Sequence, residues 1–211
     1  MPLPKSLLRA GFFLLYNHLA FTYDAVAWLV SLGAWARWRR TVMPYLRPGP
    51  TLELAFGTGG LFADLCDAGR RPVGIDLSPF MARLAARRLR RRGLPLALAQ
   101  ARTQALPFPA GRFANLVATF PTPCIFEPAT LSEAHRVLAD AGRLVIVTQG
   151  HLHAPPPVTA FIEWLYAVTG QRGFGGAEVL GRFRQAGFEA RWERAEADGH
   201  VATLIVARKT G

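Results

Sequence analysis

An acid, two glycines and a second acid form the part of the sequence best suited to chemistry. Glu53 opens the stretch Glu53-Leu54-Ala55-Phe56-Gly57-Thr58-Gly59, and Asp76 comes 17 residues after Gly59. Glycines let the backbone approach a ligand closely. An acid at the tip of the second strand of a βαβ unit is where ribose hydroxyls are bound. The spacing therefore predicts a nucleoside-binding site, with a turn that merely tightens a loop as the alternative for the glycines alone.

The same turn argues against a dinucleotide. The fingerprint G-x-G-x-x-G needs a third glycine for close helix packing, and Phe62 occupies that position. Glu53 would repel a pyrophosphate but would suit a ligand with a cationic end. We therefore expect a nucleoside that carries an amino acid.

Apolar runs and helical patterns alternate along the chain and must position these residues. Strands are predicted at 51–55, 72–76, 94–99, 115–119 and 144–147, and helices at 61–68, 78–92, 131–138, 158–168 and 178–186. A hairpin, 188–194 with 201–207, closes the chain. Residues 11–38 are predicted to form two aromatic-rich helices. The alternation predicts a parallel sheet with helices on both faces, ended by an antiparallel pair.

Composition indicates one folded domain with a basic surface. The 211 residues are 51% hydrophobic, which excludes a disordered chain, and 25 Lys and Arg against 14 acids give a formal charge of +11. Such a charge favours anionic membranes or nucleic acids as partners. Almost all the bases are arginine, so high-GC coding or thermal adaptation explains the charge equally well. The helix at 78–92 is interpreted as a solvated face, with a nucleic acid or lipid contact as the alternative; it carries Arg83, Arg87, Arg88, Arg90, Arg91 and Arg92.

The cysteines and the apolar N-terminal stretch indicate where in the cell the protein is found. Cys66 and Cys124 lack metal-type spacing and are expected to be buried reduced thiols, so no metal site is predicted. Asp24 makes a spanning helix costly within the apolar stretch 10–36, and no signal-peptide cleavage pattern follows it. We expect a cytoplasmic protein, with peripheral association at an anionic membrane.

In these landmarks the chain resembles the class I S-adenosylmethionine-dependent methyltransferases, with their type 11 domain. The match runs from Thr51 to Lys209 and comprises, in order, the E-x-A-x-G-x-G turn, Gly74-Ile75-Asp76-Leu77-Ser78, Gln104-Ala105-Leu106-Pro107-Phe108, and Arg136-Val137-Leu138 through Gly142-Arg143-Leu144. The beginning of the chain looks like that of the ubiquinone/menaquinone C-methyltransferases, in Tyr23-Asp24, Ser31-Leu32-Gly33 and Trp38.

The resemblance implies an α/β, Rossmann-like, doubly wound seven-stranded sheet with an antiparallel last strand. It implies a single domain over 1–211, in which residues 1–47 form a helical lid and 48–211 the cofactor-binding core. The implied cofactor is S-adenosyl-L-methionine. Glu53 would face its methionine amino group, Asp76 both ribose hydroxyls and Leu77 the adenine. The remaining implied cofactor-binding residues are Tyr23, Ala55, Phe56, Gly57, Thr58, Gly59, Arg102, Thr103, Gln104, Thr119 and Phe120.

Three positions depart from the family pattern. Ala55 replaces the usual first glycine, and its added methyl group should be tolerable if the backbone there is extended. Arg102 stands where an Asp or Asn often accepts a hydrogen bond from the adenine amino group, which a guanidinium cannot do. Ala114 follows Phe113, where the family often has an acid.

The expected function is methyl transfer to a small, apolar acceptor of aromatic or quinone type. A general base is needed only if the acceptor must lose a proton, and the candidates are His18, Tyr23, His151 and His153, of which His18 and Tyr23 are preferred. An RNA methyltransferase and a non-catalytic cofactor-binding protein remain alternatives. Thr119-Phe120-Pro121-Thr122-Pro123 differs from the N-P-P-Y-like tetrapeptide of base-amino methyltransferases, which makes nucleic acid the weaker expectation.

Overall fold

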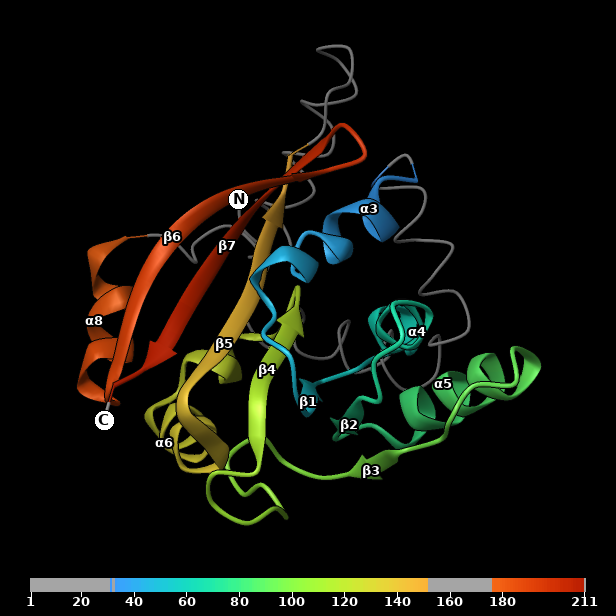
Figure 1. The fold of residues 1–211 in the computed structure, drawn as a ribbon, viewed down its shortest axis with the longest axis horizontal. Coiled ribbons are helices and arrows are strands. Elements are labelled where there is room, and N and C mark those ends of the chain that lie inside the picture. Colours follow the sequence, from blue (N-terminus) through green and yellow to red (C-terminus); the bar gives the residue numbers. More distant parts are fainter. Residues whose placement is uncertain (1–30, 32, 152–175, 211) are drawn as a thin grey trace, which may run out of the picture.

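The computed structural model describes residue 31, residues 33–151 and residues 176–210. One mixed sheet has the strand order β3-β2-β1-β4-β5-β7-β6 (Figure 1). β3 (Leu98–Gln100), β2 (Val73–Asp76), β1 (Thr51–Leu54), β4 (Phe113–Thr119) and β5 (Leu138–Gly150) are parallel. β7 (His200–Lys209) runs antiparallel to β5 and to β6 (Phe188–Ala197). The predicted seven-stranded sheet, with an antiparallel last strand, is confirmed.

The strand order reverses direction beside β1. From β1 the chain moves outward to β2 and β3, and then returns to the other side of β1 with β4 and β5. In open α/β sheets, ligands bind outside the carboxyl ends of the strands at such a reversal. The residues that follow β1 and β4, at 55–59 and 119–120, therefore occupy the position where this fold binds ligands.

Helices cover both faces of the sheet. α6 (Pro128–Val137), α8 (Ala177–Gln185) and η3 (Pro123–Phe126) contribute to the core on one face. α3 (Trp35–Arg40) and α4 (Gly60–Asp67) contribute to the core on the other, and η2 (Met43–Tyr45) leads into β1. α5 (Pro79–Arg91) packs against α4 and against β2 and β3.

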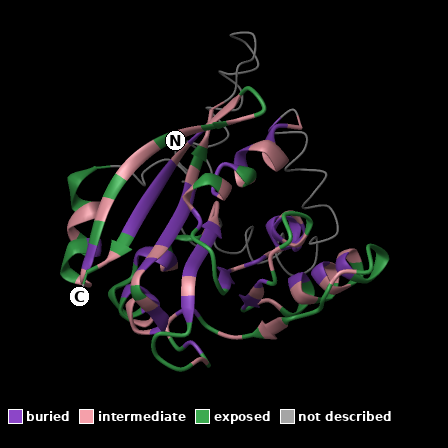
Figure 2. Cartoon of the chain, viewed as in Figure 1, coloured by how far each residue is buried: buried purple, intermediate pink, exposed green. Residues whose placement is uncertain are grey.

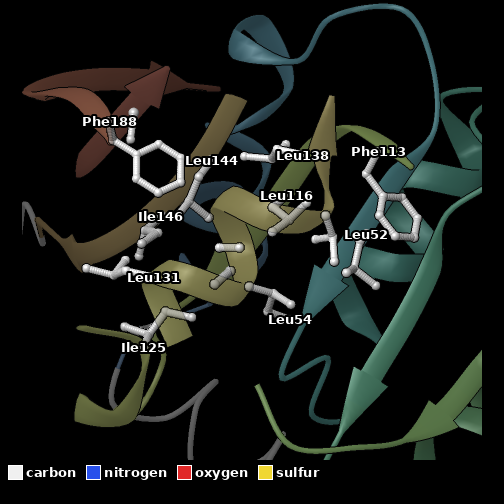
Figure 3. Close-up of a cluster of buried hydrophobic side chains, with 14 of the residues drawn as sticks. Leu52, Leu54, Phe113, Leu116, Ile125, Leu131, Leu138, Leu144, Ile146 and Phe188 are labelled. Carbon is white, nitrogen blue, oxygen red and sulfur yellow. The ribbon is translucent and has the colours of Figure 1, made fainter. Parts of the chain in front are cut away.

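Strand alternation separates two buried layers and sends one acid into the interior. Leu52 and Leu54 of β1 point into the core on the α6 side (Figure 3), and the central strands are buried along most of their length (Figure 2). Glu53 points the other way and pairs in register with Val117, which belongs to the core under α3 and α4. This alternation leaves Glu53 only 1% exposed.

Most predicted elements are present with boundaries close to those expected. α5 begins as predicted, because the Ser78 hydroxyl accepts a hydrogen bond from the Met81 backbone N–H and Pro79 takes the first helical position. The closing hairpin turns at Asp198 and Gly199, which both have positive φ, as a two-residue hairpin turn requires.

Two strands differ from the prediction for identifiable reasons. β3 begins at Leu98 and not at Leu94, because the Leu94 N–H instead closes the end of α5 on the Leu89 carbonyl and Pro95 has no N–H to donate. β5 begins at Leu138, directly after α6, and not after Gly142. Its pairing with β4 shifts register there, so Gly142 lies within a bulged part of the strand.

Other expectations are only partly met or lie outside the described residues. Both cysteines are half-buried rather than buried. Of the predicted N-terminal helices, α3 lies within the described residues, and the predicted helix 158–168 lies outside them. Within residues 33–151 and 176–210, none of the helices combines the length and apolar character needed to cross a bilayer.

Trp38 anchors α3 to the sheet by packing on Gly150, so a larger residue at Gly150 should destabilise the fold. A Cβ on Gly150 would lie 2.1 Å from the Trp38 ring, and Trp38 is fully buried. We expect Gly150→Ala to lower the free energy of unfolding by about 1–3 kcal/mol through overpacking.

Gly181→Ala is the control in a denaturant titration. No atom in the part of the chain that the structure describes lies within 4 Å of a Cβ at Gly181, inside α8, so this change should stabilise by about 1 kcal/mol. Equal stability of the Gly150→Ala variant and the wild type would show that Trp38 does not rest on β5.

Candidate nucleoside-binding site

A hydrogen bond joins the turn after β1 to the tip of β2. The Gly57 backbone N–H donates to Asp76 Oδ2 at 2.8 Å, and the Ser78 N–H donates to Asp76 Oδ1 at 2.8 Å. The structure thus brings the predicted turn and the predicted acid together. A carboxylate has about four lone-pair sites, so each oxygen of Asp76 can accept a further hydrogen bond from a ligand hydroxyl.

The backbone N–H groups of the turn are largely used within the protein. Phe56 N–H donates to the Ile75 carbonyl, Gly57 N–H to Asp76, and Gly59 N–H to the Phe56 carbonyl. A phosphate-binding loop needs such donors directed at its ligand. The turn is therefore poorly suited to a pyrophosphate, which agrees with the sequence argument against a dinucleotide.

The two glycines have different roles. Both have positive φ, 55° at Gly57 and 74° at Gly59. A Cβ on Gly57 would meet no atom of the described residues within 4 Å, so among these residues the backbone is open to a ligand. A Cβ on Gly59 would lie 2.9 Å from the Cβ of Ala85. Gly59 therefore lets α5 pack against the turn, and only Gly57 offers the close backbone approach that was expected of both.

Backbone strain marks both strand ends at the reversal. Ala55 follows β1 with φ 55°, and Phe120 follows β4 with φ 48°. The extended backbone that would make the Ala55 methyl group tolerable is therefore not present. The left-handed region costs an L-residue about 1–2 kcal/mol, and such outliers gather at binding sites, where the surrounding structure enforces them.

Glu53 is a buried carboxylate without enough partners. Its Oε2 has no hydrogen-bond partner among the described residues. Burial raises the pKa of Glu53 well above its ordinary value of 4.5, and the nearby charge of Arg39 opposes that rise, while Asp64 and Asp76 add to it. A buried acceptor of this kind is costly without a donor. It therefore suits a ligand that carries a cationic amino group.

Arg39 ties α3 to the helix that follows the turn. Its Nε donates to Asp64 Oδ2 at 2.5 Å, and its guanidinium lies against Gly60, where a Cβ would come within 2.9 Å of Nη1. The glycine at the start of α4 thus makes room for the arginine. Sequence reasoning identified neither Arg39 nor Asp64, because they meet only through the packing of α3 on α4.

The sequence analysis also did not identify the role of Arg88. Arg88 Nη1 donates to the Thr58 carbonyl at 2.9 Å and to Thr58 Oγ1 at 3.0 Å. One member of the arginine-rich helix α5 therefore fixes the glycine-rich turn, and the interpretation of its arginines as a solvated face does not hold for Arg88. The exposed residues Arg83, Arg87, Arg90 and Arg91 fit the original interpretation.

The loop after β3 is held by α6. Thr103 is buried and shares a hydrogen bond with Thr130, while the Gln104 side chain donates to Glu127. Arg102 is exposed. Glu133 and Arg136 of α6 are half-buried; Glu133 accepts from the Leu106 N–H and Arg136 donates to the Leu106 and Phe108 carbonyls. These bonds fix residues 102–108 near the end of β2.

Apolar groups flank the two strand ends. Leu77, directly after Asp76, is 58% exposed, so its side chain is available to a flat ligand. The centroid of the Phe120 ring lies 4.1 Å from that of the Trp35 ring and 6.2 Å from that of the Trp38 ring. These contacts link the end of β4 to α3. Thr119 ends β4 beside it.

Of the four candidate general bases, the structure describes only His151. His18, Tyr23 and His153 lie outside the described residues. His151 follows the end of β5 and shares a hydrogen bond with the Thr203 hydroxyl at 2.7 Å. Nothing in the described residues assigns a base.

Comparison with known proteins identifies a family. A model described as a methyltransferase domain matches residues 51–142. A demethylmenaquinone methyltransferase of Thermus thermophilus is 36% identical over 178 residues, which cover 80% of this chain and 78% of that protein. One from Symbiobacterium thermophilum is 30% identical, over 73% of this chain and 63% of its own length. The chain thus spans just under two thirds of that second relative.

Solved structures agree on the fold. Geranyl diphosphate C-methyltransferase from Streptomyces coelicolor, bound to S-adenosyl-L-homocysteine, has a TM-score of 0.62 at 16% identity and covers 81% of this chain and 77% of its own. A Haemonchus contortus phosphoethanolamine N-methyltransferase bound to S-adenosyl-L-methionine has a TM-score of 0.57 at 13% identity, over 82% of this chain and 52% of its own.

Glu53 predicts an unusual pH dependence of stability. An acid whose pKa is raised in the folded state binds more protons folded than unfolded, so its burial costs stability increasingly as pH rises above 4.5. Glu53→Gln removes that charge. Relative to wild type, the variant should gain about 1 kcal/mol or more between pH 5 and pH 8, on top of a pH-independent cost for its unpaired amide.

Denaturant titrations at both pH values measure this difference. Glu196→Gln, an exposed substitution on β6, provides the comparison for a change of glutamate at the surface. A Glu53→Gln difference from wild type that is the same at pH 5 and pH 8 would contradict a buried, titrating carboxylate.

Proposed function

The chain belongs to the class I S-adenosylmethionine-dependent methyltransferases, and on that basis we propose that it methylates a small apolar acceptor of the quinone type. Its cofactor is S-adenosylmethionine. The acceptor class rests on one observation: the relative that is 36% identical over most of both chains is a demethylmenaquinone methyltransferase.

The residues of the site suit this cofactor. Glu53 offers an unpaired buried oxygen for the amino group, and the Asp76 carboxylate offers its remaining lone pairs to the ribose hydroxyls. Leu77 would cover the adenine, residues 102–104 would close its far side, and Thr119 and Phe120 would lie near the sulfonium. When bound, the cofactor supplies a methyl group on a good leaving group, so the protein contributes mainly by positioning.

The acceptor is placed by the N-terminal part of the chain. We assign residues 1–47 as a lid and residues 48–211 as the core of a single domain. If the acceptor is an electron-rich aromatic carbon, that carbon bonds to the methyl group and then loses its proton. His18 or Tyr23 of the lid would take that proton. A lipid-soluble quinone also favours work at an anionic membrane surface, to which a formal charge of +11 is suited.

RNA is the second candidate acceptor. Residues 77–126 contain arginines and neither an acid nor a lysine, a pattern that nucleic acid also attracts. The sequence after β4, Thr119 to Pro123, lacks the tetrapeptide expected for a base-amino acceptor, so RNA ranks second. A binding protein without catalysis, suggested by Ala55 and Arg102, ranks third.

Transfer of a labelled methyl group tests the acceptor. The purified chain is incubated with methyl-labelled S-adenosylmethionine and a reduced demethylmenaquinone with a short side chain in detergent, with transfer RNA in a parallel reaction. We expect label in the quinone alone. Label in RNA alone would replace the proposal with the second candidate, and cofactor binding without transfer to either substrate would contradict it.

Asp76→Asn tests the ribose contact with less damage to the turn than alanine, because its amide oxygen can still accept from one of the two backbone N–H groups that Asp76 binds. An amide nitrogen cannot accept from a hydroxyl, so calorimetry should show S-adenosylhomocysteine bound roughly 10- to 100-fold more weakly. Alanine is less informative, because it would leave the Gly57 and Ser78 N–H groups without their acceptor.

Asp67→Asn is the matched control for this change, since Asp67 pairs with Arg92 at the surface of α4. Its affinity should equal that of the wild type. An Asp76→Asn variant with wild-type affinity would show that this carboxylate does not bind the ribose.

A further inference from the structure

One groove on the molecule combines arginines with an exposed apolar floor. It lies between α5 and the chain leading into β3, and has a volume of about 500 Å³. Three exposed arginines of α5 form its rim, Arg83, Arg87 and Arg90, spaced at four and three residues along one helical face. Ala82, Ala86, Leu96 and Leu98 line it. β3 is the edge strand on this side (Figure 1).

The charge around this groove is unusually one-sided. Residues 77–126 contain no acid, and their eight basic residues are all arginine: Arg83, Arg87, Arg88, Arg90, Arg91, Arg92, Arg102 and Arg112. This segment supplies most of the net charge of +11. Arg88 fixes the turn and Arg92 pairs with Asp67. The rim arginines are not needed for those contacts and are displayed on the surface.

Apolar side chains are exposed on the same helix and loop. Leu96 is 42% exposed in the groove, and Phe80, under the Arg83 guanidinium, is 37% exposed. The loop between α5 and β3 is exposed along most of its length (Figure 2), and Leu94 within it is half-buried. Arginines beside exposed apolar side chains match an interface of anionic headgroups above acyl chains. Single-stranded RNA would favour aromatic side chains interleaved with the arginines, and α5 has only Phe80.

We propose that the groove formed by α5 and residues 96–98, rimmed by Arg83, Arg87 and Arg90, binds anionic phospholipid and docks the protein on an acidic membrane. The choice of a membrane rests on the proposed lipid-soluble acceptor. The guanidinium groups bind headgroup phosphates in forked pairs. Leu96 enters the acyl boundary. Because α5 begins three residues after Asp76 and packs on β2 and β3, this contact lies on the same side of the sheet as the Asp76 end of the cofactor site.

Vesicle sedimentation tests the proposal without depending on activity. The wild-type chain should bind vesicles of phosphatidylcholine with 30% phosphatidylglycerol, by a fraction that falls with salt, and should not bind pure phosphatidylcholine. The triple variant R83Q/R87Q/R90Q should bind the anionic vesicles roughly a hundredfold more weakly. R184Q/R191Q/R194Q, which removes the same charge at exposed positions of α8 and β6, should bind as the wild type does.

The assay in detergent separates this proposal from the function itself. The α5 triple variant should methylate detergent-solubilised quinone at the wild-type rate and lose rate only with quinone in anionic vesicles. Equal vesicle binding by the two triple variants would overturn the groove as the docking site. A transfer RNA gel shift abolished by the α5 triple variant, with no vesicle binding by the wild type, would assign the groove to nucleic acid instead. If the wild type does not methylate the quinone in detergent, the proposed function is refuted, and the vesicle-binding result is unaffected.

Discussion

The hydrogen bond from Gly57 N–H to Asp76 Oδ2 is the contact on which the site depends. It exists because β1 and β2 pair in parallel, with Leu54 opposite Ile75, so that their carboxyl ends meet at one edge of the sheet. The other Asp76 oxygen binds the Ser78 N–H at the start of α5. One carboxylate therefore fixes the turn, the strand tip and the next helix, and still presents lone pairs to a ligand.

The features that most destabilise this fold lie around the candidate site. Glu53 is buried with an unpaired oxygen, and Ala55 and Phe120 have left-handed backbones at the two strand ends. The packed layers under α3, α4 and α6 can enforce these features. A cationic ligand would relieve the cost at Glu53, because it supplies the donor that the described residues lack.

Much of the fold and the two acids could be predicted from local sequence. Most strands, the start of α5 and the position of Asp76 follow from periodicity and spacing, and the structure agrees. Arg39, Asp64 and Arg88 could not be predicted, because their contacts join residues 25 and 30 positions apart through helix packing. The left-handed backbone of Ala55 could not be predicted for a related reason. Its φ is set by tertiary packing, and an alanine in the sequence gives no local indication of a positive φ. The bulge at Gly142 likewise depends on pairing with β4.

A crystal structure of the chain with bound S-adenosylhomocysteine tests the central claim most directly. The account predicts both ribose hydroxyls within about 2.5–3.0 Å of the Asp76 carboxylate oxygens, the nucleoside lying over Gly57, and the amino group directed toward Glu53. A cofactor bound elsewhere on the sheet, or a ribose whose hydroxyls face another acid, would contradict it.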